Sequence, residues 1–126
     1  DQCNDEQIAF NLSGKKELGL VIGHRGETLD ALQYLTSIYV NKNTEEYLRV
    51  VLDAEGYRER RRATLERLAE RLAAKAERKE RKVVLEPMPP HERRIIHIKL
   101  KENNNVKSYS EGEEPYRKVM IEPLDN

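Results

Sequence analysis

The stretch Gly23-His24-Arg25-Gly26 carries the strongest local signal in this chain, and it lies between two segments with helical patterning. Glycine permits positive φ and close approach of another backbone because it has no Cβ atom. The helix expected after this stretch directs its N-terminal amides and positive dipole end back toward it, and Arg25 adds a planar cation. Such a loop can seat a sugar-phosphate backbone. Four residues alone are more typical of a glycine-capped connector between two helices.

The segments around this loop have a regular order. Residues 8–12 and residues 48–52 each show the alternation of a half-buried strand, and residues 15–22 predict a short helix. A second helix is predicted after the loop, where apolar residues recur at helical spacing: Leu29, Leu32, Leu35, Ile38 and Tyr39. The order strand, helix, G-x-x-G, helix, strand over residues 6–53 resembles the K-homology (KH) nucleic-acid-binding domain. We therefore place a KH domain of β-α-α-β type at residues 1–55.

This resemblance implies that the G-x-x-G loop clamps a few backbone nucleotides of a single strand. The bases would then lie along an apolar groove edged by Ile22, Leu29 and the strand at 47–52. Tyr47 is expected to pack in the sheet rather than to stack on a base.

Composition and charge limit the remaining possibilities. The chain has 126 residues, of which 37% are hydrophobic and 37% charged, so we expect two small domains with modest cores. The net charge is zero, but residues 58–82 contain eleven Lys or Arg and five Glu, which gives the middle of the chain a basic field suited to phosphate. We see no membrane span and no secretory leader. The single cysteine, Cys3, excludes an internal disulfide and indicates a reducing compartment.

Residues 57–81 predict one long helix rich in good helix formers. Its buried stripe is expected to consist of small and branched apolar residues: Leu65, Leu68, Ala69, Leu72, Ala73 and Ala76. The charges can be a solvated face with weak i,i+4 ion pairs, such as Arg62 with Glu66. The cluster formed by Arg58, Arg60, Arg61 and Arg62 is less well neutralised, which makes it a candidate phosphate-facing patch.

The second half predicts one more helix and three strands. Prolines 87, 89 and 90 end a strand at 82–86 and begin a helix that reaches residue 101, and strands follow at 106–110 and 116–121. Arg93 and His97 lie one turn apart on this helix. They can be a surface arginine beside a locally bonded histidine, or a ledge where Arg93 binds phosphate and His97 binds a base, sugar or phosphate.

Residues 57–122 resemble the R-x-x-x-H ("R-three-H") domain, a single-stranded nucleic-acid-binding module. We place this domain at residues 56–126, including the connecting helix. The complete fold is therefore predicted as α+β, with a KH unit and a second domain that carries a small three-stranded sheet.

Both halves together resemble the Jag family, the SpoIIIJ-associated proteins, also called KhpB or EloR. Four words carry the resemblance: G-L-V-I-G-H-R-G-E-T-L-D-A-L-Q-Y-L at 19–35, V-V-L-D-A-E-G-Y-R at 50–58, E-P-M-P-P-H-E-R-R-I-I-H at 86–97 and Y-S-E-G-E-E-P-Y-R at 109–117. The resemblance implies a cytoplasmic RNA-binding regulator linked to cell elongation, division or sporulation. It also implies association with a small single-KH protein and proximity to the YidC/SpoIIIJ membrane insertase.

Two departures from the family pattern stand out. Relatives usually carry Lys where this chain has His24, and a neutral imidazole lowers the charge of the loop. Relatives also have a further N-terminal domain that is missing here.

The leading hypothesis is a module that binds single-stranded RNA, or single-stranded DNA, and the alternative is a protein-interaction or homodimerisation module associated with the insertase. We expect no enzyme activity, no cofactor and no metal site, and we interpret Glu111, Glu113 and Glu114 as a flexible acidic turn rather than a cation site. The candidate nucleic-acid contacts are Ile22, Gly23, His24, Arg25, Gly26, Arg58, Arg61, Arg62, Arg93, Arg94 and His97.

Overall fold

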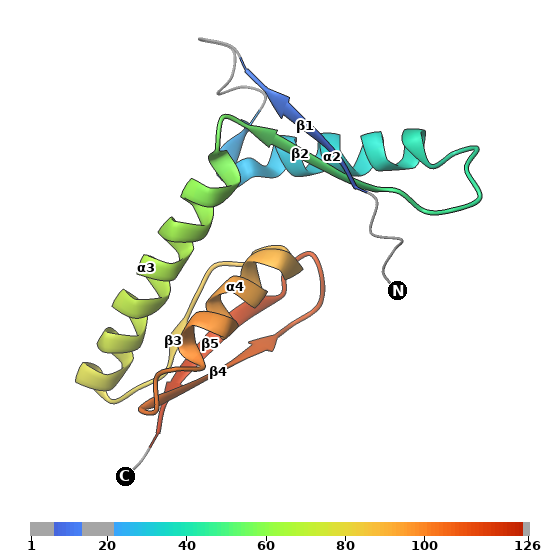
Figure 1. Ribbon diagram of the computed structural model, residues 1–126. Helices are drawn as coiled ribbons and strands as arrows, with labels where there is room; N and C mark the ends of the chain where they lie inside the picture. Colours follow the sequence, from blue (N-terminus) through green and yellow to red (C-terminus); the bar gives the residue numbers. More distant parts are fainter. Residues whose placement is uncertain (1–6, 14–21, 125–126) are drawn as a thin grey trace. The chain divides into compact units, whose positions relative to one another are not determined.

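The computed structural model describes residues 7–13 and 22–124 and divides into two compact units, residues 1–61 and residues 62–126. Within the described residues each unit pairs a small sheet with helices, and Figure 1 shows these elements along the chain. This confirms the predicted class of mixed helices and strands. The helix predicted at 15–22 lies outside the described residues, except for Ile22, which is helical.

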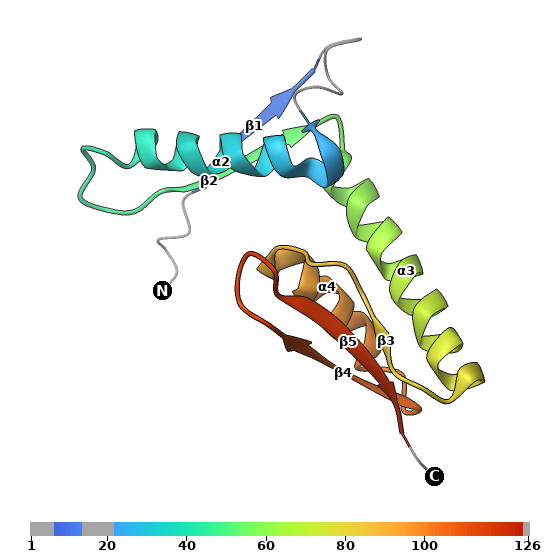
Figure 2. The same ribbon diagram turned by 180° about the vertical axis from the view of Figure 1, so that it is seen from behind.

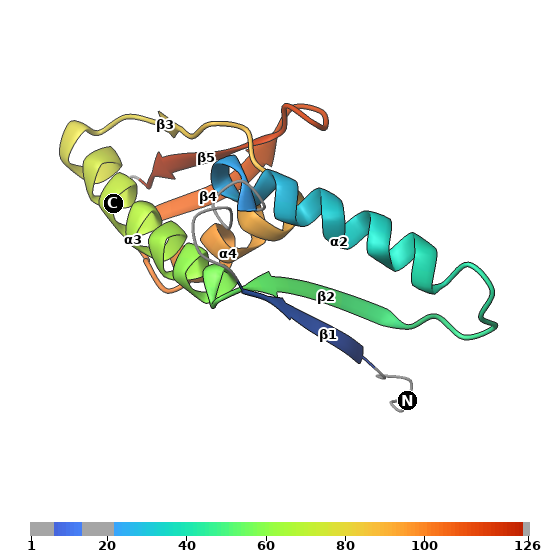
Figure 3. The same cartoon turned by 90° about the horizontal axis from the view of Figure 1, so that it is seen from above.

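In residues 7–13 and 22–61, the sheet of the first unit is formed by two parallel strands, β1 (Gln7–Leu12) and β2 (Arg49–Ala54). Their register runs from Gln7 opposite Arg49 to Leu12 opposite Ala54. A 3-10 turn, η1 (His24–Gly26), leads directly into helix α2 (Glu27–Val40), which lies along β2 in Figure 3. The connection places the glycine loop at the start of α2, as the KH pattern predicts.

Among the described residues of the first unit, the buried cluster is small. It consists of Leu29, Leu52 and Ala54, and Leu12, Ile22 and Tyr57 pack against it. The other apolar residues at helical spacing on α2 are exposed, with exposed fractions from 36% to 78%: Leu32, Leu35, Ile38 and Tyr39. The pattern therefore predicted the helix correctly, although most of its apolar residues do not enter the described core.

Tyr47 corrects a second expectation. It precedes β2 and is 69% exposed, so the prediction that it packs in the sheet is wrong. Its hydroxyl lies 3.1 Å from the Ser37 hydroxyl of α2. The side chain of Asn41 instead joins the end of α2 to the segment before β2, because its Nδ2 donates to the carbonyls of Ser37 and Leu48.

Helix α3 (Tyr57–Lys79) continues from the first unit into the second. Its buried residues are Leu65, Ala69, Ala73 and Ala76, with Leu68 and Leu72 packed beside them, as the predicted stripe requires. The helix ends at Lys79, two residues before the predicted end, because Glu80 adopts a left-handed φ of 53°.

The second unit contains an antiparallel sheet of order β3-β5-β4. Its strands are β3 (Val83–Val84), β4 (Val106–Glu111) and β5 (Lys118–Pro123). Helix α4 (Pro90–Leu100) covers one face of this sheet, as Figure 1 and the reversed view in Figure 2 both show. Ile96, Val119 and Ile121 are fully buried in the core. The three predicted strands and the helix are confirmed.

Local features explain two element boundaries in this unit, of which the first differs from the sequence prediction and the second agrees with it. Strand β5 starts two residues later than predicted because residues 112–117 form the turn, where Gly112 has a φ of 98°. Pro90 occupies the first turn of α4, where its missing N–H costs nothing. Among the described residues, no helix is long and apolar enough to cross a membrane.

Candidate nucleic-acid interface

The glycine loop of the first unit has three positive-φ positions within four residues. Gly23 has a φ of 76°, Arg25 of 56° and Gly26 of 78°. The Gly26 N–H donates to the Gly23 carbonyl at 3.4 Å, which closes the turn. A left-handed conformation costs a non-glycine residue about 1–2 kcal/mol, so Arg25 is held in a strained position. The loop is a defined turn rather than a loose connector.

The two glycines are required by packing inside the protein. A Cβ atom on Gly23 would lie 2.8 Å from the Cβ of Thr28, and one on Gly26 would lie 2.7 Å from the Tyr57 ring. Gly26 is buried, whereas His24 and Arg25 are exposed. The surface of the loop is therefore made by the two middle side chains, and the glycines bring them there.

The first turn of α2 places two acidic side chains after the loop, those of Glu27 and Asp30. The N-cap residue, Gly26, has no side chain that could cap the helix. Leu29 is fully buried, so the prediction that it edges a base-binding groove is wrong. Ile22 packs partly against the core and lies beside the loop.

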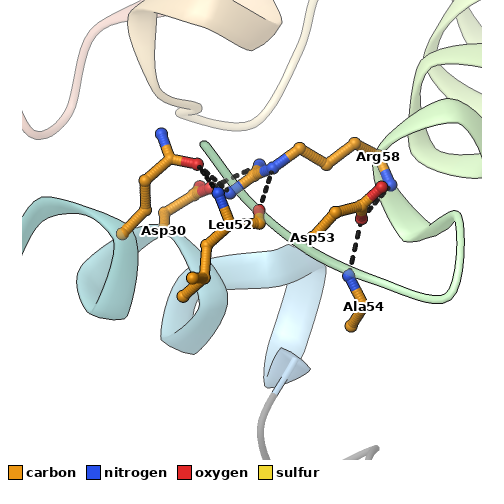
Figure 4. A network of polar contacts seen from close by, with 6 residues as sticks. Asp30, Leu52, Asp53, Ala54 and Arg58 are labelled. Carbon is orange, nitrogen blue, oxygen red and sulfur yellow. Dashed lines mark hydrogen bonds and ion pairs between the residues drawn. The ribbon is translucent and has the colours of Figure 1, made fainter. Parts of the chain in front are cut away.

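Arg58 holds three elements of the first unit together (Figure 4). Its Nε donates to the Leu52 carbonyl at 2.7 Å, its Nη1 to Asp30 at 2.9 Å and its Nη2 to Gln33 at 3.0 Å. Asp53 completes the network by accepting the backbone N–H groups of Ala54 and Arg58. Arg58, which was predicted to contact phosphate, thus donates hydrogen bonds to residues of α2 and β2 instead.

The other three members of the predicted arginine cluster are placed differently. Arg60 donates from its Nη1 to the Glu55 carbonyl. Arg61 is partly buried, and Arg62 is exposed and lies 3.8 Å from Glu66 in the predicted i,i+4 pair. An exposed pair of this kind contributes little to stability, so Arg62 can turn toward a ligand at low cost.

In the second unit, Arg93 of α4 is buried, with 7% of its surface exposed. Its Nη1 donates to the Met88 carbonyl at 2.8 Å, and its two Nη atoms donate to the Glu114 carboxylate at 3.2 and 2.7 Å. Hydrogen bonding from Arg93 lowers the pKa of Glu114 below its ordinary value. Glu114 therefore lies in the predicted acidic turn, and Arg93 holds both of its carboxylate oxygens there.

His97 lies one turn further along α4 and is bonded at both ring nitrogens. Nδ1 lies 2.7 Å from the Ser108 hydroxyl, and Nε2 lies 2.8 Å from the Ser110 hydroxyl. Burial lowers the pKa of His97 below its ordinary value of 6.5, and the charges of Arg93 and Arg117 lower it further. A neutral imidazole suits this place, because one nitrogen donates and the other accepts.

An open pocket of about 370 Å³ lies between α4 and the strands, and its lining includes Arg93, Arg94, His97, Lys101, Ser110 and Arg117. The structure thus brings together the three predicted residues of this region. The sequence reasoning missed Lys101, Arg117, Glu114 and the two serines. Ser108 and Ser110 could have been found, because residues two apart on a strand point to the same face.

Comparisons with known proteins agree with both halves of this description. Residues 1–52 match the KhpA/KhpB KH domain family, and residues 63–123 match the R-three-H domain. An RNA-binding protein KhpB from Clostridium symbiosum is 52% identical over 117 residues, which is 93% of this chain and 52% of that relative. The two halves of the chain match these two domain families, and the chain is similar to KhpB proteins along almost its whole length. The resemblance to the Jag proteins is thereby confirmed.

Two further KhpB relatives have lower identity. The protein from Lactiplantibacillus plantarum is 46% identical over 103 residues, covering 82% of this chain and 32% of the relative. The one from Bacillus subtilis is 39% identical over 122 residues, covering 95% and 58%. The chain spans between about a third and three fifths of the length of these KhpB proteins. Among its described residues, no group of three or more His, Cys, Asp or Glu side chains is placed to hold a metal ion.

Proposed function

We propose that this chain binds single-stranded RNA, or single-stranded DNA, through the glycine loop of the first unit. The observation that carries the proposal is the positive-φ turn that exposes His24 and Arg25 directly before the N-terminus of α2. Backbone amides and cations together bind phosphate oxygens. The curated relatives bear the name RNA-binding protein, which supports the same assignment.

A second binding surface is proposed around the pocket of the second unit. Arg93, Arg94 and His97 are the sequence-predicted residues there, and a single strand can pass across the open pocket. Arg61 and Arg62 supply additional positive charge on α3, whereas Arg58 supports the first unit internally. Phosphate contacts should dominate the affinity, so binding should be moderate and sensitive to salt.

The proposed role is that of a regulator rather than an enzyme. The family resemblance supports a cytoplasmic protein linked to cell elongation, division or sporulation, with a small single-KH protein as partner and the membrane insertase nearby. Homodimers are compatible with this role.

One observation favours a second candidate function, a protein-interaction module. The residues Leu32, Leu35, Ile38 and Tyr39 expose a large apolar area on α2. Exposed apolar patches of this kind often mark protein contacts. Replacing Leu35 and Ile38 with Glu should abolish self-association or partner binding, measured by sedimentation, if this face is an interface.

Fluorescence anisotropy with a labelled single-stranded RNA tests the proposed function. The chain should bind, and its affinity should fall when salt rises from about 50 mM to 200 mM. Arg25→Ala should weaken binding, whereas Arg71→Ala, an exposed arginine on α3, should not. Equal melting temperatures serve as the fold control. Absence of binding, or binding that ignores salt, contradicts RNA binding and favours the interaction module.

A further inference from the structure

We propose that Arg94, Lys101 and Arg117 contact the phosphates of a single RNA strand at the second surface, while Arg93 and His97 are positioning residues that hold the pocket together. This inference rests on the proposed RNA binding. It assigns the contacts to residues other than the two that name the R-x-x-x-H pattern.

Arg93 has few donors left for a ligand. It is 7% exposed, and its terminal nitrogens are engaged by the Met88 carbonyl and both oxygens of Glu114. The carboxylate also offsets its charge at 2.7 Å. A phosphate would have to reach the two N–H groups that these bonds leave over, on a side chain that is almost completely buried, or displace the ion pair. The arrangement instead ties α4 to the segment before it and to the β4–β5 turn.

His97 is occupied in the same way. Both ring nitrogens lie within 2.8 Å of serine hydroxyls on β4, so the ring joins α4 to that strand at two points. A neutral imidazole has one donor and one acceptor, and both are used here. The ring therefore orients the wall of the pocket that carries Ser110.

The remaining cations of the lining are better placed to contact a ligand. Arg94 on α4 and Lys101, the C-cap residue of that helix, are both exposed. They lie seven residues apart, and helical spacing puts them on one side across two turns. Ile98 lies between them in the lining and is 60% exposed, which offers an apolar surface for a sugar or base. No described residue of the lining carries a carboxylate, although Glu114, which pairs with Arg93, is close enough to Arg117 to interact with its charge.

Arg117 completes the set from the opposite wall. Its Nη1 donates to the Gly112 carbonyl at 2.6 Å and its Nη2 more weakly to the Ser110 carbonyl at 3.4 Å. A guanidinium has five N–H donors, so Arg117 can brace the hairpin and still donate to a phosphate. A volume of about 370 Å³ is at the lower end for ligand pockets and fits about one nucleotide.

The contact residues are tested by salt titration of RNA binding with the full chain. Each phosphate contact to a single strand contributes about 0.7 to the slope of log K against log salt. The double variant Arg94→Ala, Lys101→Ala should lower the slope by about 1.4. The matched control Arg71→Ala, Lys75→Ala removes one Arg and one Lys from exposed positions on α3 and should leave the slope unchanged.

The positioning residues are tested through their partners, which leaves Arg93 and His97 in place. The double variant Ser108→Ala, Ser110→Ala should weaken RNA binding as much as His97→Ala does. In both variants the slope of log K against log salt should equal that of the wild type. The variant Glu114→Gln should also keep that slope. If Arg93 itself contacts phosphate, Glu114→Gln releases it, and the binding becomes tighter and the slope steeper.

The outcomes separate this inference from the proposed function. If the wild-type chain binds no RNA, the proposed function fails. If it binds and the Arg94, Lys101 double variant keeps the wild-type slope, the contact assignment is overturned. If His97→Ala weakens binding and the serine double variant does not, His97 contacts the strand directly and the positioning role is overturned. Circular dichroism and melting curves verify that each variant folds.

Discussion

The glycine loop of the first unit and the helix–hairpin site of the second unit present positive charge in opposite ways. In the loop, an unusual backbone conformation carries His24 and Arg25 to the surface. On α4, the backbone is regular and the motif side chains turn inward, where Arg93 and His97 are bonded to the β4–β5 hairpin. A short sequence pattern can thus act through backbone geometry in one domain and through a side-chain network in another.

This difference determines how each motif responds to substitution. The glycines of the loop are constrained by neighbours at contact distance, and Arg93 is constrained by its ion pair. Substitutions at these positions should therefore affect folding first. Ligand contacts are better tested at exposed neighbours such as Arg25 and Arg94.

The largest effect is expected for Gly26→Ala. The new Cβ combines a left-handed φ of 78° with a 2.7 Å clash against Tyr57, and the free energy of unfolding should fall by about 2–5 kcal/mol. Gly56→Ala is the matched control, because its φ is 75° but its nearest contact is 3.6 Å away, and it should cost about 1–2 kcal/mol. Denaturant unfolding measures both. Equal losses would show that the clash with Tyr57 is relieved at no cost.

The corresponding change in the second unit is Arg93→Met. It keeps much of the side-chain volume but leaves the buried Met88 carbonyl without its donor, so unfolding should be easier by about 1–3 kcal/mol. Arg94→Met, on the exposed side of the same helix, should change stability by less than about 0.5 kcal/mol. A similar melting temperature for both variants would contradict the structural role of Arg93.

A smaller effect is expected from pH. Because the folded-state pKa of His97 is lowered, the unfolded chain binds more protons below the ordinary pKa of 6.5. The contribution of neutral His97 to the free energy of unfolding is complete above pH 6.5 and is lost as the pH falls through the lowered pKa of the folded state. Glu114 loses its contribution only in more acidic solution, below its ordinary pKa of 4.5. Thermal unfolding between about pH 8 and pH 5 should show the His97 loss, and His97→Gln should reduce it. An unchanged pH profile in that variant would exclude His97 as the cause.

The smallest expected effect is a gain at the loop. His24→Lys adds a full charge at an exposed position, so RNA affinity should rise and the salt slope should steepen by about 0.7. Lys75→Arg, which keeps the charge on α3, is the control. Anisotropy titrations at two salt concentrations measure the change, and an unchanged slope would mean that residue 24 does not face the strand.

The elements of both units could be predicted from local patterns. Strand alternation at 48–52, the alanine and leucine stripe of α3 and Pro90 at the start of α4 each depend on neighbours within a few residues. The errors concern partners distant in the chain. Leu29 is buried, and Tyr47 is exposed, because α2 and β2 meet in a way that no short pattern specifies.

The features of the candidate site can also be separated into local ones and ones that depend on distant partners. The sequence determined that glycines flank two exposed loop residues and that Arg93 and His97 share a helix face, because φ preferences and helical periodicity are local properties. The tertiary structure decided that Arg93 meets Glu114, that His97 meets two serines and that Arg117 joins the pocket. Those side-chain contacts join residues 11 to 21 positions apart, and they form only when the β4–β5 hairpin folds back onto α4.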